Sequence, residues 1–315
     1  MNPEPTRRRK PRKAQKPVKA EICLVNLIEK FGTDAQCLDY LVGLRWKDGV
    51  TCPRCSHKGI SILQGRDKFE CNSCGYQFTA TAGTIFHDTH LPLWKWFLAT
   101  YSMIESKKGI SACQIQRTLQ VSYKTAWYLC HRIRNAMRDV NSEQLSGVVE
   151  IDETYVGGKV RGMGRGYKGN KSIAIGAVQR GGKIRLQVIP FADRETLHKF
   201  VADNTAPDTE AIYTDELPAY IGIQDEDTRH ESVNHSAEEW VHGDVHTNGI
   251  ESVWSLLKRS IVGSYHKVSM KHLDAYLDEL EFRFNNRRNE FLFRDTIMKL
   301  AHSTKLPYQE LTKAA

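Results

Sequence analysis

Two closely spaced pairs of cysteines constrain the fold of this chain more than any other sequence feature. Cys52-Pro-Arg-Cys55 and Cys71-Asn-Ser-Cys74 are separated by 15 residues, with Gly65 in the segment between them. One C-x2-C turn lets two thiolates reach one ion, and two such turns complete the tetrahedral four-sulfur site that structural zinc prefers. The intervening apolar residues around Gly65 indicate a short hairpin. We therefore predict a zinc ribbon in which Zn²⁺ is bound by Cys52, Cys55, Cys71 and Cys74.

Two disulfides, or buried free thiols, would also be compatible with this spacing. Disulfides are rare inside cells, and the basic start of the chain is followed by Glu21 and Glu29 without a small-residue cleavage site. The sequence also has no run of about 18 uncharged apolar residues that would span a membrane. We expect a cytoplasmic protein without a membrane partner. Four further cysteines fall on apolar helical faces and are expected to be buried: Cys23, Cys37, Cys113 and Cys130.

Positive charge is concentrated at the start of the chain. The net charge is +8, and residues 1–19 contain eight Lys or Arg against one Glu, so they account for +7 of it. Such a proline-containing stretch buries too little surface to fold, which predicts a disordered basic arm. The arm would attract phosphates or would only aid solubility. Helical periodicity follows over residues 21–46.

Residues 86–140 have the pattern of three helices, at about 92–105, 111–119 and 123–138. Ser122 is placed to cap the third helix after a short turn. Lys124, Tyr128 and Arg132 project away from the apolar stripe of that helix. These features indicate a helix-turn-helix whose last helix enters a DNA major groove. A three-helix packing unit with a solvated basic face is the alternative.

The second half of the chain changes to strand-like runs. Strands are expected at 148–152, 172–178, 184–189, 211–215 and about 229–234, with helices at 194–204, 248–261 and 270–285. Three strands, a crossover helix, a further strand and then helices indicate an α/β sheet covered by helices. Residues 157–171 carry six glycines and five Lys or Arg, which suits a loop along a phosphate backbone or a flexible hairpin with incidental charge.

Three acidic residues in this half point to metal chemistry. Asp152 and Asp215 each end an expected strand, and ligands bind where neighbouring strand ends meet. Glu251 follows Asp215 after 35 residues, on the first turn of a helix. Three clustered acids repel one another and are best stabilised by divalent cations. Two such ions clamp the attacking and leaving oxygens of a phosphodiester displacement.

The helix that carries Glu251 has a polar face on which Asn248, Glu251 and Lys258 align. Lys258 would then contact a scissile or neighbouring phosphate. Taken alone, Glu251 and Lys258 are better explained by a solvated helix face with routine ion pairs, and Asp152 or Asp215 by a strand-end cap or turn acid. The functional interpretation gains from their combination in this order and spacing. His242 and His246, just before this helix, would help to position a phosphate or are simply solvated.

The ordered set of motifs resembles the bacterial insertion-sequence transposases that join an N-terminal zinc ribbon to a DDE catalytic domain. Beyond the two cysteine pairs, the similarity lies in the following segments: Thr84-Ile85-Phe86, Glu150-Ile151-Asp152-Glu153-Thr154-Tyr155, Tyr213-Thr214-Asp215, His246-Thr247-Asn248-Gly249-Ile250-Glu251 and Trp254 through Arg259. The resemblance implies an RNase H-like catalytic domain, Mg²⁺-dependent DNA cleavage and strand transfer, and assembly on paired DNA ends.

The resemblance assigns Asp152 and Asp215 to the first two acidic positions and leaves the third open. The group presents either an asparagine or a glutamate there, followed by a lysine. We favour Glu251, because the 35-residue interval and Lys258 seven residues later match the wider DDE pattern. Asn248 would then be a neighbouring polar ligand or orienting group. If Asn248 is the metal-site member instead, Glu251 supports it and the reaction class is unchanged.

We therefore expect a multi-domain α+β and α/β protein that binds structural Zn²⁺ and two catalytic Mg²⁺ ions, or Mn²⁺. Its partners would be double-stranded DNA, at element ends and target, and a second copy or more of itself, in the bacterial nucleoid. A DNA nuclease without strand transfer and a zinc-containing DNA-binding regulator are the rival functions. The expected parts are a basic arm (1–20), N-terminal helices (21–46), a zinc ribbon (47–85), a helix-turn-helix-like segment (86–140), the RNase H-like domain (147–290) and a C-terminal helical tail (291–315).

Overall fold

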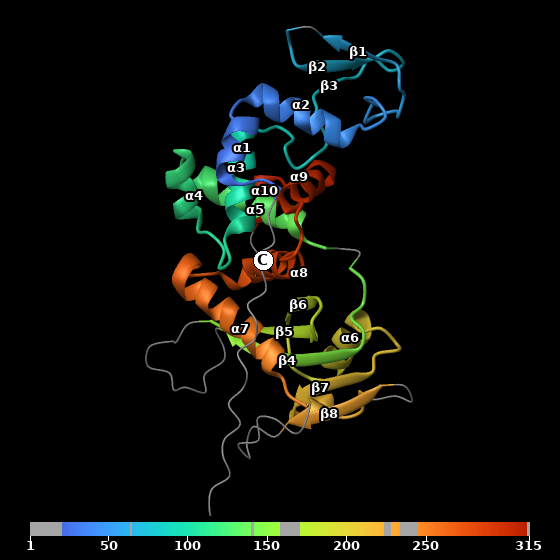
Figure 1. Cartoon of the computed structure of the whole chain (residues 1–315), viewed down its shortest axis with the longest axis vertical. Helices are drawn as coiled ribbons and strands as arrows, with labels where there is room; N and C mark the ends of the chain where they lie inside the picture. Colours follow the sequence, from blue (N-terminus) through green and yellow to red (C-terminus); the bar gives the residue numbers. More distant parts are fainter. Residues whose placement is uncertain are drawn as a thin grey trace, which may run out of the picture.

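The computed structural model describes residues 21–63, 65–139, 142–157, 171–223, 228–233 and 245–313. Figure 1 shows three parts in a row: a small sheet at one end, a helical module in the middle and a larger sheet at the other end. The expected basic arm and most of the glycine-rich loop lie outside the described residues. In the described part of the chain, no helix has both the length and the apolar character needed to cross a membrane.

The small sheet is the expected hairpin with one additional strand. Helices α1 (Leu24–Phe31) and α2 (Asp34–Arg45) precede the antiparallel strands β1 (Ile60–Leu63), β2 (Lys68–Cys71) and β3 (Gln77–Phe78). The rings of Trp46, Phe69 and Phe78 pack against one another, with centroids 5.6–6.1 Å apart. This aromatic cluster and two buried cysteines, Cys52 and Cys71, form a core of their own beneath the sheet.

The helical module consists of α3 (Leu93–Glu105), α4 (Ala112–Leu119) and α5 (Tyr123–Met137), close to the predicted bounds. Ser122 caps α5 as expected, since its hydroxyl accepts a hydrogen bond from the backbone N–H of Thr125 at 3.1 Å. Helix α9 (Leu292–His302) returns from the other end of the chain into the same core. There the ring of Phe293 lies 5.8 Å from the rings of both Phe31 and Phe97.

Two sequence predictions about this module are wrong in part. Arg132 does not project to solvent: it is 6% exposed, and its guanidinium donates to the carbonyl of His87 at 3.0 Å. Helix α5 runs through the middle of the module, so its later turns are buried almost all round. Cys37 and Cys130 are buried as expected, but Cys23 and Cys113 are exposed, because they lie at the starts of the outer helices α1 and α4.

The larger sheet has the strand arrangement of an RNase H-like fold, which confirms the predicted fold class. Its order is β6-β5-β4-β7-β8, formed by β4 (Val148–Val156), β5 (Ser172–Gln179), β6 (Ile184–Ile189), β7 (Ala211–Asp215) and β8 (Arg229–Val233). Strands β4, β5 and β6 are antiparallel, whereas β7 and β8 run parallel to β4. β6 and β7 therefore run in the same direction, and the crossover helix α6 (Arg194–Asn204) makes the connection that such a pair of strands requires.

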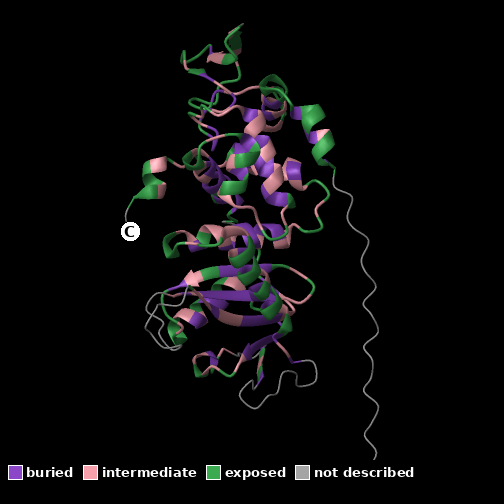
Figure 2. Cartoon of the chain, turned by 90° about the vertical axis from the view of Figure 1, so that its left-hand side faces the viewer, coloured by how far each residue is buried: buried purple, intermediate pink, exposed green. Residues whose placement is uncertain are grey.

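Helices cover both faces of this sheet. Leu197 and Phe200 of α6 pack on one face, and α7 (Asn248–Ser260) and α8 (Leu273–Asn285) pack on the other. The strands between them are largely buried (Figure 2). Helix α7 continues into a π-helical turn, Ile261–Tyr265, and a 3₁₀ turn, Met270–His272, precedes α8, so α8 begins later than predicted. A last short helix, α10 (Tyr308–Thr312), and a 3₁₀ turn at Pro218–Tyr220 complete the described elements.

A buried ion-pair network joins the helical module to the helices of the larger sheet. Arg134 of α5 donates to Glu279 of α8 at 2.6 Å, and both side chains are at most 2% exposed. Arg283 also pairs with Glu279, and the hydroxyl of Tyr265 donates to the same carboxylate at 3.0 Å. Burial opposes ionisation, but Arg283 and Arg134 outweigh it and lower the pKa of Glu279. The carboxylate therefore stays charged between its two guanidinium groups.

Replacing Glu279 by Gln tests the importance of this network for stability. The substitution leaves two buried guanidinium groups without a counter-charge, and breaking a buried pair from one side costs about 3–5 kcal/mol. We expect the free energy of unfolding, measured in urea, to fall by about that amount. Asp203→Asn, which breaks an exposed pair with Lys199, should leave it nearly unchanged. Equal urea midpoints for Glu279→Gln and the wild type would contradict the prediction.

Candidate functional site

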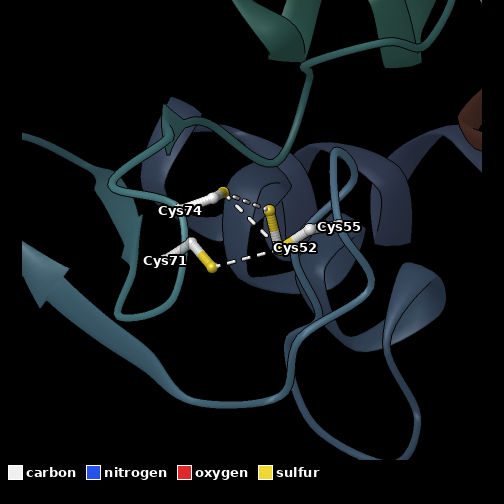
Figure 3. A group of neighbouring side chains, drawn as sticks. All are labelled: Cys52, Cys55, Cys71 and Cys74. Atoms are coloured by element: carbon white, nitrogen blue, oxygen red, sulfur yellow. Dashed lines mark hydrogen bonds between the residues drawn. The ribbon is translucent and has the colours of Figure 1, made fainter.

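The four predicted zinc ligands converge at one point of the ribbon (Figure 3). The sulfur of Cys55 lies 3.5 Å from those of Cys71 and Cys74, and the sulfurs of Cys52 and Cys74 are 3.8 Å apart. A tetrahedral site with Zn–S bonds of about 2.3 Å requires sulfurs about 3.8 Å apart. All eight cysteines are free thiols, which excludes the disulfide alternative in this structure. The four-sulfur cluster therefore fits a structural zinc ion.

The two halves of the cluster are built by the same backbone turn. The N–H of Ser56 donates to the carbonyl of Cys52, and the N–H of Gly75 donates to that of Cys71, each at 2.9 Å. Ser56 and Gly75 both adopt left-handed conformations, with φ of 59° and 65°. Glycine takes this conformation without steric cost, which explains Gly75 after the second pair. Each turn directs two thiols to the same side.

The pairing of β4 with β7 places the first two acids next to each other. Val148 is opposite Ala211 and Glu150 is opposite Tyr213, so the same register brings Asp152 opposite Asp215. Asp215 ends β7 as predicted, but Asp152 is not at a strand end: it is the fifth of nine residues of β4. β4 continues because its antiparallel pairing with β5 extends to Val156. Asp152 therefore lies mid-strand, level with the carboxyl end of β7.

The surroundings of Asp152 disfavour its charged form in the absence of a cation. Burial raises the pKa of Asp152 to about 7, and the neighbouring carboxylates of Glu153 and Asp215 contribute to the rise. The indole N–H of Trp254 on α7 donates to Oδ2 of Asp152 at 3.0 Å, which acts in the opposite direction. In the sequence, Trp254 stood out only as the first residue of a segment that resembles the transposase family. Its position one turn before Lys258, on the side of the helix that faces the sheet, could have indicated this contact with Asp152.

Helix α7 has the two faces predicted from its sequence. Ile250, Val253, Trp254 and Leu257 are buried against the sheet, whereas Asn248, Glu251, Ser255 and Lys258 are exposed. Asp152, Glu251 and Lys258 line one open pocket of ≈ 620 Å³, together with Arg259. Asp215 and Asn248 are not part of the lining of this pocket. The structure thus brings Asp152, Glu251 and Lys258 to one surface. Asp215 lies beside Asp152 because their strands are neighbours in the sheet.

The three carboxylates do not form a closed cluster like that of the four cysteines. Among the described residues, only the cysteines supply three or more potential ligand atoms within 4.8 Å of one another. Each acid instead accepts a hydrogen bond within the protein: Asp152 from Trp254, Asp215 from the N–H of Leu217 and Glu251 from the hydroxyl of Thr247. Carboxylate oxygens are the ligands that Mg²⁺ and Mn²⁺ prefer. A divalent cation between them would also relieve the repulsion that raises the pKa of Asp152.

The start of α5, the helix expected from the sequence to enter a DNA groove, is exposed. Tyr123 is 50% exposed and Lys124 is exposed, and the first residues of a recognition helix are those that contact bases. The C-terminal segment lies beside this helix: Tyr128 donates to the carbonyl of Leu306, and the ammonium of Lys124 lies 4.5 Å from the ring centre of Tyr308. Of the two histidines before α7, His246 is half-buried and His242 lies outside the described residues.

Comparison with known sequences gives matches in both halves of the chain. A family model described as an ISXO2-like transposase domain matches residues 144–285, and a transposase zinc-ribbon domain matches residues 32–77. An uncharacterised protein in the transposable element ISH50 of Halobacterium salinarum is 31% identical over 277 residues, which cover 81% of this chain and 92% of that protein. An uncharacterised transposase-like protein of Haemophilus influenzae is 29% identical over 104 residues, or 33% of this chain and 82% of that protein.

Solved structures show more remote similarity. The pre-cleavage Mos1 transpososome has a TM-score of 0.28 and 10% identity, covering 65% of this chain and 75% of that chain. The Mos1 strand transfer complex has a TM-score of 0.30 and 9% identity, covering 65% and 74%.

Substitution of a single ribbon cysteine tests the zinc site. Cys52→Ser removes one of four thiolates, and metal binding supplies much of the free energy that folds so small a module. We expect the zinc content of the purified protein, measured by atomic emission, to fall from one ion per chain to well below one. Cys113→Ser, which changes an exposed cysteine outside the cluster, should retain its zinc. Full zinc content in Cys52→Ser would exclude the assigned ligand set.

Proposed function

The chain belongs to the ISXO2-like transposase family, and on that premise we propose that it cleaves the ends of a bacterial insertion sequence and joins them to target DNA. The catalytic ions would be two Mg²⁺, or Mn²⁺, bound by Asp152, Asp215 and Glu251. The zinc ribbon and the helical module would bind the element ends. The protein would act on the DNA of the nucleoid, in the cytoplasm of a bacterial host.

One observation carries this proposal. Asp152 on β4 and Glu251 and Lys258 on α7 line the same open pocket, and the β4–β7 register sets Asp215 beside Asp152. Asp215 and Glu251, which follow Asp152 by 63 and 99 positions in the chain, thus add hard oxygen ligands to it, and Lys258 adds a positive charge. This combination is what metal-dependent phosphoryl transfer requires. It also favours Glu251 over Asn248 as the third acidic position.

The roles of the individual residues follow from their placement. Trp254 fixes Asp152 by its hydrogen bond to Oδ2. Lys258 and Arg259 present positive charge on the pocket wall, where they would bind the scissile phosphate or its neighbour. When bound, a pair of divalent cations would stabilise the charge that develops on the attacking and leaving oxygens. The open pocket would admit a DNA backbone from the solvent side.

Two successive reactions would use this one pocket. In cleavage, water attacks the phosphorus atom at the element end, and the bond to the 3′-oxygen breaks to leave a 3′-hydroxyl. In strand transfer, that 3′-hydroxyl attacks a phosphorus atom of the target and displaces its 3′-oxygen. Because two ends must be processed together, we expect a homodimer or larger assembly on DNA.

Replacing Asp152 by Asn should abolish cleavage. Mutation of residues that only hydrogen-bond to metal ligands lowers metal affinity or activity about 10–100-fold. For a direct ligand we therefore expect the cleavage rate to fall by more than about 100-fold. The measurement is single-turnover cleavage of labelled end DNA in Mg²⁺ and in Mn²⁺, with excess chelator as a blank. Asp203→Asn, at an exposed site on α6, serves as the matched control. Robust cleavage by Asp152→Asn or in chelator would rule out the metal mechanism.

The third acidic position can be assigned by comparing two neighbouring variants. Glu251→Gln should lose cleavage to the same extent as Asp152→Asn, since both side chains line the pocket. Asn248→Ala should retain most of it, because Asn248 lies outside that lining. The same single-turnover assay compares them. A reversed order of the two effects would assign the position to Asn248.

Joining of precleaved ends separates the proposed function from its rivals. A nuclease would release only hydrolysis products, whereas a transposase would insert the 3′-ends into a target plasmid. We expect covalent joined products in Mg²⁺, resolved by gel electrophoresis, that disappear with Asp215→Asn. If Asp152→Asn and Asp215→Asn left every DNA-dependent activity intact, a zinc-containing regulator would be the better description.

A further inference from the structure

Helix α7 begins without a capping side chain of its own. The first N–H groups of a helix have no partners within the helix, and the N-cap residue, Thr247, makes no side-chain hydrogen bond to them. Glu150 of β4 accepts these hydrogen bonds instead. Its Oε2 atom lies 2.6 Å from the N–H nitrogen of Gly249 and 3.2 Å from that of Ile250. A carboxylate on a sheet strand thus caps the helix that carries Glu251.

The second carboxylate oxygen of Glu150, Oε1, also has close polar partners. Nε of Arg180, just after β5, donates to Oε1 at 2.9 Å, and Nδ1 of His246 lies 3.2 Å from the same atom. Arg180 also donates to the carbonyl of His246 at 3.2 Å. The side chain of Glu150 is only 1% exposed, so its charge is balanced by the guanidinium and by the positive end of the α7 dipole.

The contact with Glu150 leaves room for no side chain at Gly249. A Cβ atom added at Gly249 would lie 2.5 Å from Oε2 of Glu150, which is closer than atoms can approach. Alanine is the better helix former, so helix propensity does not explain glycine in the first turn of α7. The close approach of the Glu150 carboxylate to the backbone explains why glycine is found here.

Strand and helix are therefore joined at two matched points. Glu150 and Asp152 are two residues apart on β4 and share one face of the sheet. Their partners on α7, Ile250 and Trp254, are four residues apart and share one face of the helix. Glu251 lies between these two partners in the sequence, on the exposed flank of the helix next to them.

We propose that Glu150 is a positioning residue that fixes the start of α7 against β4 and so sets the place of Glu251 relative to Asp152. This inference rests on the proposed function for its catalytic consequence, but the capping contact is testable without activity. Glu150 itself lies behind the pocket and would not contact DNA or metal ions.

Glu150→Gln is the first test. Whichever way the amide turns, its NH₂ group faces either the helix N–H groups or Arg180, so one set of hydrogen bonds is lost. Hydrogen exchange followed by mass spectrometry should show the amides at the start of α7 exchanging about tenfold faster. Single-turnover cleavage at saturating metal should fall about 100-fold, the effect of a displacement of about 1 Å, with DNA affinity unchanged.

Glu281→Gln is the matched control. Glu281 on α8 also accepts a backbone N–H, that of Leu186 at 2.8 Å, and pairs with Arg185 at 3.2 Å, but it contacts β6 rather than α7. It should lower stability without changing exchange in α7 or the cleavage rate. An equal loss of cleavage in both variants would overturn the proposal, as would wild-type exchange and cleavage in Glu150→Gln.

Gly249→Ala gives an independent test if Glu150→Gln fails to fold. It keeps the carboxylate but forces it and the first turn of α7 apart, so we expect the same faster exchange and the same loss of cleavage. Gly43→Ala, at a helical glycine with no atom within 4 Å of the added Cβ, should change neither. Normal exchange and cleavage in Gly249→Ala would contradict the proposal. An inactive wild type would refute the proposed function alone, since the exchange measurements would still report on the cap.

Discussion

The parallel pairing of β4 with β7 is the constraint on which the rest of the catalytic half depends. It sets Asp152 and Asp215 side by side although 62 residues lie between them, and it does so only because α6 carries the chain back across the sheet. A shift of one residue in this register would turn Asp152 to the opposite face. The buried, apolar faces of the sheet prevent such a shift. Packing thus fixes the positions of Asp152 and Asp215 relative to each other.

Helix α7 completes the proposed site and also links the larger sheet to the helical module. Its N-terminal half is joined to β4 through Glu150 and Trp254, and its π-helical extension ends at Tyr265. Tyr265 donates to Glu279, which Arg134 of α5 also contacts. The helix that carries Glu251 is therefore held at one end by the sheet and at the other by the module expected to bind DNA. This arrangement gives the two halves of the protein a direct, buried contact.

The sequence was most informative where local chemistry decides the structure. Cysteine spacing predicted the four-sulfur cluster, the apolar period predicted the helices, and Ser122 predicted the start of α5. Long-range partners could not be predicted in this way. Arg132 has the composition of a DNA-contacting residue, yet tertiary packing buries it, and Glu150 and Trp254 acquire their roles only from contacts about 100 residues away. Asp152 was expected at a strand end because the residues around it do not reveal how far β4 pairs with β5.

The central claim is that Asp152, Asp215 and Glu251 bind divalent cations at one place. The most direct measurement is anomalous diffraction from crystals of the protein with end DNA and Mn²⁺. We expect a manganese peak bounded by carboxylate oxygens of Asp152 and Asp215, with Glu251 contributing to the same site. Manganese bound only elsewhere, or a peak from which Asp152 and Asp215 are both absent, would contradict the claim.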